Sequence, residues 1–535
     1  MTMTETMTAR GWRGPMDAVA FDAPGIRQRL ADLDAPCYLV RDAGRLGATG
    51  AGEDTPGALA ELPLIAALPP LAPSRLGNPA FARRFGVRYA YAAGAMANGI
   101  ASEELVIALG QAGLLCSFGA AGLTPPRIEA AIATIQAALP HGPYAFNLIH
   151  SPSEEAIERR AVDLFLAHGI TIVEASAFLS LTPTIVRYRL AGLSQDAQGR
   201  VVVRNRVIAK VSRREVAEPF LRPAPAAMVQ QLLASGAVTA EQAALAARVP
   251  MCDALTAEAD SGGHTDNRSL VCLFPAMLAL RDAIQAELRY AESPLVGAAG
   301  GIGTPMAALA AFAMGADYIV TGSVNQGCIE SGASPHSRAL LAQADSADVI
   351  MAPAADMFEM GVKVQVLKRG TMFAQRAQKL YDIYRSYDSM AAIPAAERAQ
   401  IEQQIFRRSL DDIWAGTRAY FLDRDPEQVE RAEANPKRQM ALVFRWYLGL
   451  SSRWSNAGEA GRELDYQIWC GPAMGAFNEW TRGTYLEQPG ARRAAEVAEH
   501  MMRGAAYLAR IQQLRLAGVP VPPQFAHYLP APIRV

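Results

Sequence analysis

The feature that most constrains the fold of this sequence is a set of eight short apolar segments that alternate with amphipathic ones. These segments are RYAYAAGAM (88–96), LLCSFG (114–119), YAFNLI (144–149), TIVEAS (171–176), VIAKVS (207–212), ALTAEAD (254–260), LVGAAGG (295–301) and DYIVTGS (317–323). Strand-like runs separated by helical patterns indicate parallel βαβ units buried on both faces. Eight units in roughly 235 residues match a (β/α)8 TIM barrel, whose usual size is about 250 residues. An open doubly wound sheet stays the alternative, because periodicity alone does not show closure.

The chain of 535 residues has room for more than this barrel. We expect an N-terminal appendage over residues 1–75, and the barrel over 76–325. In the appendage, PCYLVRD (36–42) suits a short strand, GRLGATGAGEDTPG (44–57) a flexible loop and LPPLAPS (68–74) a linker. Past residue 325 the strand-like runs stop. Apolar spacing there predicts a mainly helical domain over 326–490, then a C-terminal helix and tail over 491–535 that pack on the barrel.

Charge and cysteine usage exclude several classes of function. Lys plus Arg number 51 and Asp plus Glu 52, so nothing indicates binding to nucleic acid or an anionic membrane. The six cysteines form no CxxC pair, which argues against a disulfide framework or a structural metal site. The N-terminus lacks the apolar core of a signal peptide, and no apolar run approaches the ~20 residues of a membrane span. We therefore expect a soluble, cytoplasmic protein.

Glycine clusters follow the last two predicted strands. Gly300 and Gly301 come after the seventh strand, and Gly322 and Ser323 after the eighth. In such barrels the loops after strands seven and eight are the usual phosphate site, where backbone N–H groups meet the anion. The alternative is that these glycines serve only tight turns.

Polar side chains stand inside other predicted strands. Asn147 in an apolar strand needs hydrogen-bond partners, which a flat heterocycle or neighbouring backbone would supply. Lys210, in VIAKV, is of a type seldom buried unpaired, so it either holds an anionic ring or pairs with Glu174.

The segment EADSGGHTDN (258–267) places two glycines and a histidine after the sixth strand. The glycines let the backbone approach a planar ligand closely, and His264 is a candidate proton donor or acceptor. GxSxG and HExxH motifs are absent. A phosphate site, a heterocycle and one acid/base group favour an FMN oxidoreductase, in which the cofactor supplies the reactive chemistry.

Longer motifs add a resemblance to a known family. EADSGGHTDN, GAAGGIGTPMAALAAFAMGADYIVTGS and NGIASEELVIALGQAG resemble the FMN-dependent nitronate monooxygenase and enoyl reductase superfamily. GPYAFNLIHSPSEEAIERRAVDLFL and QIWCGPAMGAFNEWTRGTYLE look like PfaD-type enoyl reductases, which act in trans in polyunsaturated fatty acid and polyketide assembly lines. The resemblance runs from about residue 60 to the C-terminus.

The resemblance implies particular roles for particular residues. The catalytic histidine of the superfamily falls on His264, and the phosphate of FMN would lie against Gly300, Gly301, Gly322 and Ser323. The other FMN-binding positions would be Gly94, Ala95, Met96, Asn147, Lys210, Gly262 and Gly263. Nitronate enzymes usually follow the histidine with a small residue and glycine, whereas Asp266 and Asn267 stand here, which argues against nitroalkane chemistry.

The resulting expectation is an enoyl reductase that uses FMN and NADPH or NADH on thioesters of an acyl carrier protein, and that forms a homodimer. A nitronate monooxygenase and a non-catalytic carrier-binding component stay open as alternatives. The resemblance makes the helical domain over 326–490 the substrate and carrier-docking domain. Its arginines would suit an acidic carrier, although an ordinary solvated helix face explains them equally well. They are Arg376, Arg385, Arg407, Arg408 and Arg418.

Overall fold

The central part of the protein is a closed barrel of eight parallel strands. The computed structural model describes residues 10–150 and 155–533. The strands run in the closed order β12-β13-β15-β16-β6-β7-β8-β9. They are β6 (Tyr91–Ala93), β7 (Leu115–Phe118), β8 (Ala145–Ile149), β9 (Ile172–Ser176), β12 (Arg206–Val211), β13 (Ala254–Glu258), β15 (Leu295–Ala299) and β16 (Tyr318–Thr321). The predicted barrel is confirmed, and the open sheet is excluded.

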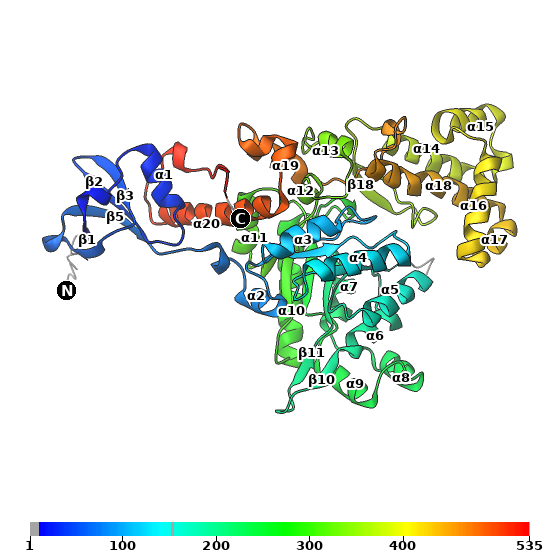
Figure 1. The fold of residues 1–535 in the computed structure, drawn as a ribbon, viewed down its shortest axis with the longest axis horizontal. Coiled ribbons are helices and arrows are strands. Elements are labelled where there is room, and N and C mark those ends of the chain that lie inside the picture. The colour runs from blue at the N-terminus through cyan, green and yellow to red at the C-terminus, as the bar shows by residue number, and fades with distance from the viewer. Residues whose placement is uncertain (1–9, 151–154, 534–535) are drawn as a thin grey trace, which may run out of the picture.

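Helices cover the outside of the barrel (Figure 1). They are α3 (Glu103–Gln111), α4 (Pro125–Ala138), α5 (Glu155–Ala167), α6 (Pro183–Ala191), α7 (Arg214–Leu221), α10 (Leu270–Leu288) and α11 (Pro305–Ala313). Two further helices, α8 (Ala226–Ala234) and α9 (Ala240–Leu245), pack on α6. Local signals begin several of them: the Ser102 hydroxyl accepts from the backbone N–H of Leu105, and the Thr304 hydroxyl from that of Ala307. A hairpin of β10 (Leu193–Gln195) and β11 (Val201–Val203), which the sequence did not suggest, extends from the β9–β12 connection.

One end of the barrel is closed by α2 (Pro79–Phe85). Phe81 and Phe85 pack with the first residues of the barrel strands, and the Phe81 ring stacks on Tyr318 with 4.3 Å between centroids. Because α2 fills the amino-terminal end, the carboxyl ends of the strands are left for a functional site, as is usual for this architecture.

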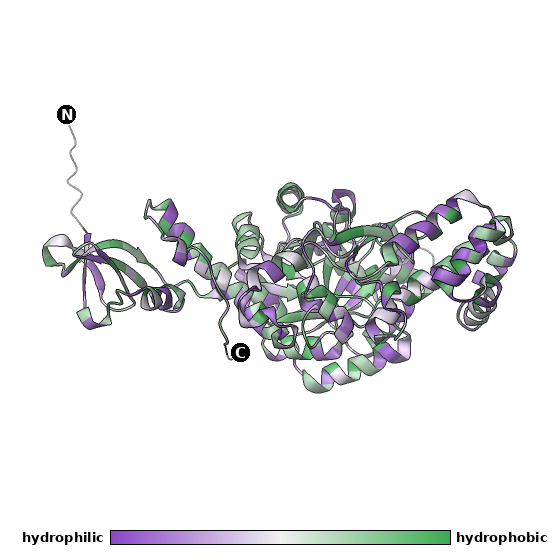
Figure 2. Ribbon diagram, turned by 90° about the horizontal axis from the view of Figure 1, so that it is seen from above, coloured by the Kyte–Doolittle hydropathy of each residue, from purple (hydrophilic) through white to green (hydrophobic). Residues whose placement is uncertain are grey.

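The N-terminal segment forms a five-stranded sheet in the order β3-β2-β5-β1-β4 that projects from the barrel (Figures 1 and 2). Its strands are β1 (Arg10–Arg13), β2 (Cys37–Asp42), β3 (Arg45–Thr49), β4 (Glu53–Pro56) and β5 (Leu62–Leu68). The prediction of a flexible loop over 44–57 is therefore wrong, because β3 pairs with β2 and β4 with β1. Residues 1–9 lie outside the described part of the chain.

The long helix α20 (Ala494–Leu516) joins this sheet to the barrel. It packs against α11 and against α1 (Ala23–Ala31). The buried guanidinium of Arg510 donates hydrogen bonds to the carbonyl oxygens of Leu30, Asp32, Ala35 and Pro69. These four bonds, all from Nη1 and Nη2 of Arg510, link the N-terminal segment to α20.

Past the barrel lies a region that is largely helical. It contains α12 (Ser323–Gln326), α13 (Pro335–Leu341), α14 (Phe373–Ser386), α15 (Ala395–Ile401), α16 (Leu410–Arg424), α17 (Pro426–Glu433), α18 (Pro436–Ala457) and α19 (Ala473–Thr481). In Figure 2 the helices at the right, opposite the N-terminal sheet, alternate between hydrophilic and hydrophobic residues, as expected for amphipathic helices around their own core. Among the helices in the described ranges, none is long and apolar enough to cross a membrane.

The expectation that strands stop at residue 325 is wrong. β17 (Val349–Pro353) and β18 (Lys363–Leu367) pair in antiparallel fashion, and β18 also pairs with the short strand β14 (Gly263–His264). This three-stranded sheet carries the helical region onto the loop that follows β13. It therefore fixes the position of His264 relative to the helices above the barrel.

Candidate active site

A cavity of about 550 Å³ lies at the carboxyl ends of the barrel strands. Its lower wall comes from the strands β8, β9, β12 and β13 and from the loops after β6, β7 and β13. Its upper wall comes from α16, α18, the connection between β17 and β18, and the segment before α19. The predicted site residues that line it are Ala95, Met96, Asn147, Lys210, Gly262, Gly263 and His264. The structure thus brings together side chains from four strands that are far apart in the sequence.

Asn147 is buried in β8, beside β9. Its amide nitrogen donates to the carbonyl of Glu174 and to the hydroxyl of Ser176, both at 3.1 Å. These bonds fix the orientation of the amide. One of them goes to neighbouring backbone, which was one of the two kinds of partner predicted for Asn147. Among the described residues no hydrogen bond reaches the amide oxygen, and Asn147 lines the cavity, so this acceptor is available to a ligand.

Lys210 lies between two glutamates on neighbouring strands. Its Nζ is 3.8 Å from Oε1 of Glu174 and 3.4 Å from Oε1 of Glu258. Burial alone would lower the pKa of Lys210, but the charges of Glu258 and Glu174 outweigh it and leave the pKa raised. The ammonium is therefore charged at neutral pH. The predicted pairing with Glu174 exists, and Glu258, which the sequence analysis did not single out, is the nearer partner.

His264 is paired with Asp356, a residue that the sequence analysis missed. The distance from Nε2 of His264 to Oδ1 of Asp356 is 3.2 Å, and both residues line the cavity. Burial acts to lower the pKa of His264, but the carboxylates of Asp356 and Glu258 raise it above its ordinary value. The imidazole is thus favoured in its protonated form, which suits a group that holds a proton for delivery.

Asp266, two positions after His264, is held ionised. Its carboxylate accepts hydrogen bonds from the guanidinium of Arg213 at 2.8 Å and from the hydroxyl of Ser212 at 2.7 Å. The bond from Arg213 is the main reason why the pKa of Asp266 is lowered to about 2. A carboxyl group of this kind does not donate protons near neutral pH.

The late glycines lie at the ends of two neighbouring strands. Gly300 and Gly301 follow β15, Gly322 follows β16, and both Gly300 and Gly301 have positive φ, which favours glycine. A Cβ built at Gly301 or Gly322 would meet no atom within 4 Å. The space beside these two glycines is therefore open. These residues, Ser323 and Gly94 lie outside the cavity lining; Gly94 donates its backbone N–H to the Thr321 carbonyl at 3.0 Å.

The segment that leads into α19 packs tightly on these loops. A Cβ at Gly262 would come within 2.9 Å of the Cys470 nitrogen, and one at Gly303 within 2.1 Å of the Ala473 carbonyl oxygen. The backbone N–H of Gly471 donates to the Ser323 hydroxyl at 3.0 Å. Glycine is therefore required at 262 and 303 for close backbone approach, and this segment covers the ends of β13, β15 and β16.

Two of the arginines expected on a carrier-docking face bind a carboxylate of their own domain. Arg376 and Arg407 both contact Asp465, a fully buried carboxylate that also accepts from the Tyr447 hydroxyl at 2.8 Å. A buried carboxylate requires cationic partners, which these two arginines supply, while Arg407 itself stays exposed. The docking of a carrier on these arginines stays a prediction. Arg418 pairs with Glu433 at 2.7 Å, whereas Arg385 and Arg408 are exposed.

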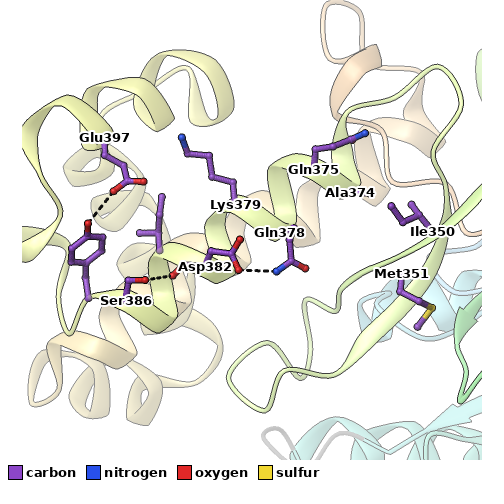
Figure 3. Close-up of a pocket in the computed structure, with 11 residues that line it drawn as sticks. Ile350, Met351, Ala374, Gln375, Gln378, Lys379, Asp382, Ser386 and Glu397 are labelled. Carbon is purple, nitrogen blue, oxygen red and sulfur yellow. Dashed lines mark hydrogen bonds between the residues drawn. The ribbon is translucent and has the colours of Figure 1, made fainter.

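A second pocket, of about 620 Å³, lies between β17 and α14 (Figure 3). Its polar groups bond to one another: Gln378 donates to Asp382 at 2.9 Å, and Tyr387 to Glu397 at 3.2 Å. No predicted site residue lines it. The cavity over the barrel, and not this pocket, is the candidate active site.

Fold and site together define a class of protein. It is a (β/α)8 barrel with a cavity at the carboxyl ends of its strands, covered by helices, and the cavity contains a lysine and a histidine that are each paired with a carboxylate. Residues 12–70 match the fatty acid synthase subunit PfaD N-terminal domain. Residues 387–466 match the inserted helical domain of acyl-carrier-protein S-malonyltransferase.

Whole-chain comparisons give a narrower assignment. A polyunsaturated fatty acid synthase subunit of Thraustochytrium is 48% identical over 94% of this chain, and polyketide biosynthesis protein PksE of Bacillus subtilis is 46% identical over 81%. The chain spans 34% and 56% of the length of these two relatives. The crystal structure of the enoyl reductase domain of MlnA, from the macrolactin biosynthesis cluster of Bacillus amyloliquefaciens, is 38% identical. That match covers 83% of this chain and 99% of the domain, with a TM-score of 0.79. The chain belongs to the PfaD-type enoyl reductase family.

Proposed function

We propose that this chain is an FMN-containing, NAD(P)H-dependent enoyl reductase. Its substrate would be the α,β-unsaturated thioester of an acyl carrier protein in polyketide or polyunsaturated fatty acid synthesis. The observation that supports this best is the presence, in one cavity, of a charged lysine and of a histidine paired with a carboxylate. The enoyl reductase domain that shares the fold at 38% identity supports the same reaction.

The residues of the site suit FMN. The open space beside Gly301 and Gly322 would accept a phosphate against their backbone N–H groups, and a Cβ at either position would enter that space. The free amide oxygen of Asn147 and the ammonium of Lys210 would meet the polar edge of the ring system. When bound, FMN would supply the relay of a hydride from NAD(P)H to the β-carbon of the substrate.

The chain's own residues would do the rest. Lys210, held in place by Glu174 and Glu258, stabilises negative charge next to it without needing to move. His264, bonded to Asp356 through Nε2, keeps Nδ1 for the proton that completes the α-carbon. Apolar side chains from the upper wall, such as Leu442, Trp446 and Phe421, exclude water from the acyl chain.

We also propose the electron donor, the partner, the compartment and the assembly. The electron donor would be NADPH or NADH, the partner an acyl carrier protein, the compartment the cytoplasm and the assembly a homodimer. The relatives supply the argument for the partner, because they are components of polyketide and polyunsaturated fatty acid synthesis.

Anaerobic turnover of an enoyl-loaded carrier protein tests the proposal. With purified yellow protein and NADPH, the intact mass of the carrier should increase by two hydrogens. Bleaching of the flavin by NADPH in the absence of any nitronate separates this activity from that of a nitronate monooxygenase. Colourless protein, or a carrier of unchanged mass, would refute the proposal.

A further inference from the structure

The charges that line the cavity are distributed unevenly. Near the barrel, Lys210 faces Glu258 and His264 faces Asp356, so positive and negative groups are matched. Two arginines, Arg445 and Arg453, line the opposite wall on α18. The Nη1 atom of Arg445 is 3.4 Å from Oε1 of Glu359, which is its acidic partner.

Arg453 makes no ion pair or hydrogen bond with the described residues, and it is exposed. Glu359 pairs with Arg445 alone, so in the described part of the chain the guanidinium group of Arg453 is not balanced by an ion pair. The α18 side of the cavity therefore carries excess positive charge, which suits an anionic ligand.

Gly449 lies one helical turn from each of these arginines and also lines the cavity. A glycine within a helix costs about 1 kcal/mol relative to alanine, so its presence needs a reason. The backbone does not require it, because Gly449 is not among the glycines with positive φ. Packing does not require it either, since a Cβ there would meet no atom within 4 Å. The effect of Gly449 is to leave open space between two cations.

Helical geometry lets both arginines reach that space. Residues four apart on a helix have Cβ atoms about 5 to 6 Å from each other on one face, so long side chains at 445 and 453 can converge over position 449. The planar guanidinium group donates paired hydrogen bonds to the oxygens of a phosphate. Thr417 of α16 also lines the cavity, and its buried hydroxyl oxygen has no hydrogen-bond partner among the described residues.

We propose that Arg445, Gly449 and Arg453 form a subsite for the phosphodiester of the phosphopantetheine arm that carries the acyl thioester. This inference rests on the proposed function, because it assumes a carrier-bound substrate. The phosphate would lie over Gly449 at the α18 wall, and the arm would run from there toward His264. The amides of the arm offer Thr417 the partner that it lacks.

Binding of two probes tests the subsite directly. Trp446 and Trp469 line the cavity, so their fluorescence should change when phosphopantetheine or pantetheine, which lacks the phosphate, is titrated into the full-length protein. The unmodified protein should prefer phosphopantetheine. Arg453→Gln should weaken phosphopantetheine about fivefold to tenfold and leave pantetheine unchanged, while Arg453→Lys should retain most of the preference.

Two further variants complete the design. Gly449→Leu fills the open space without changing charge, and should also weaken phosphopantetheine more than pantetheine. Arg515→Gln, on the exposed C-terminal turn of α20 and away from the cavity, is the matched control and should have no effect. Equal loss of both probes, or unchanged binding of phosphopantetheine in Arg453→Gln, would overturn the subsite.

The phosphates of NAD(P)H are the competing source of the same chemistry. If Arg453→Gln raised the KM for NAD(P)H and left phosphopantetheine binding unchanged, the assignment to the arm would be wrong. Failure of the proposed function looks different: no enoyl thioester would be reduced by the unmodified protein, whatever the two probes show.

Discussion

The Nε2 atom of His264 lies 3.2 Å from Oδ1 of Asp356, although 92 positions separate the two residues in the sequence. His264 stands on β14, which pairs with β18, and Asp356 stands in the connection between β17 and β18. One small sheet therefore holds both partners. The carboxylate orients the ring and favours its charged form, so Asp356 is a positioning residue for His264.

Asp356→Asn should change the pH dependence of the step that needs the proton. Asp356 raises the pKa of His264, so its removal lowers that pKa, and the loss of activity with rising pH should begin at a lower pH than in the unmodified protein. The check is flavin reoxidation by an enoyl thioester, followed by stopped flow from acid to alkaline pH. Asp356→Glu, which keeps the charge, should restore part of the original profile. An identical profile in Asp356→Asn would contradict the positioning role.

His264→Ala should separate the two half-reactions. If His264 supplies the α-proton, reoxidation of the flavin by enoyl carrier protein should slow by about 10²- to 10⁴-fold, whereas reduction by NADPH should be nearly unchanged. A histidine needed only for structure would reduce both rates together with the flavin content. Undiminished reoxidation in the variant would remove His264 from the mechanism.

Gly322→Asp should remove FMN. The position has negative φ and no atom within 4 Å of a built Cβ, so the backbone should accept a side chain there while a carboxylate enters the proposed phosphate space. Repulsion between two anions should weaken FMN by about tenfold or more, which the ratio of flavin to protein absorbance would show. Gly322→Ala is the neutral control. Gly301→Asp should act in the same direction, with added strain from its positive φ. Full flavin content in folded Gly322→Asp would argue against the phosphate site.

Lys210→Met should lower the midpoint potential of the bound flavin. The variant loses the positive charge and leaves Glu174 and Glu258 facing each other, and both changes disfavour added electrons. We expect a decrease of about 30 mV or more, which corresponds to about 1.4 kcal/mol for a two-electron couple. Lys210→Arg should stay close to the original value. An unchanged potential in Lys210→Met, measured by dye-coupled titration, would limit this lysine to a structural role.

Asp266→Asn should lower stability in a pH-dependent manner. Because the folded pKa of Asp266 is lowered to about 2, the contribution of its carboxylate is fully present above the unfolded pKa and is lost as the pH falls through about 2. Urea unfolding should show a loss of about 1 kcal/mol at pH 7 and at pH 5, since Arg213 is half exposed, and a smaller loss at pH 3. A difference that did not shrink at low pH would contradict the pairing.

The sequence by itself determined the barrel and much of its site. Eight apolar runs of strand length, separated by helical ones, leave few other ways to bury both faces of a parallel sheet. In a parallel barrel every strand ends at the same rim, so Asn147, Lys210 and His264 converge as a consequence of topology. Their places could therefore be predicted without knowing any contact.

Only the tertiary structure decided what surrounds these residues. The polar segment 44–57 forms β3 and β4 because distant strands supply hydrogen-bond partners that no local pattern reveals. Asp356 meets His264, and Arg445, Gly449 and Arg453 line the cavity, because β18 and α18 bring them over the barrel. Local sequence preferences determine which segments form helices and strands. Which charged side chains meet, as His264 and Asp356 do, depends on the path of the whole chain. For that reason the upper wall of the cavity could not be predicted from the sequence.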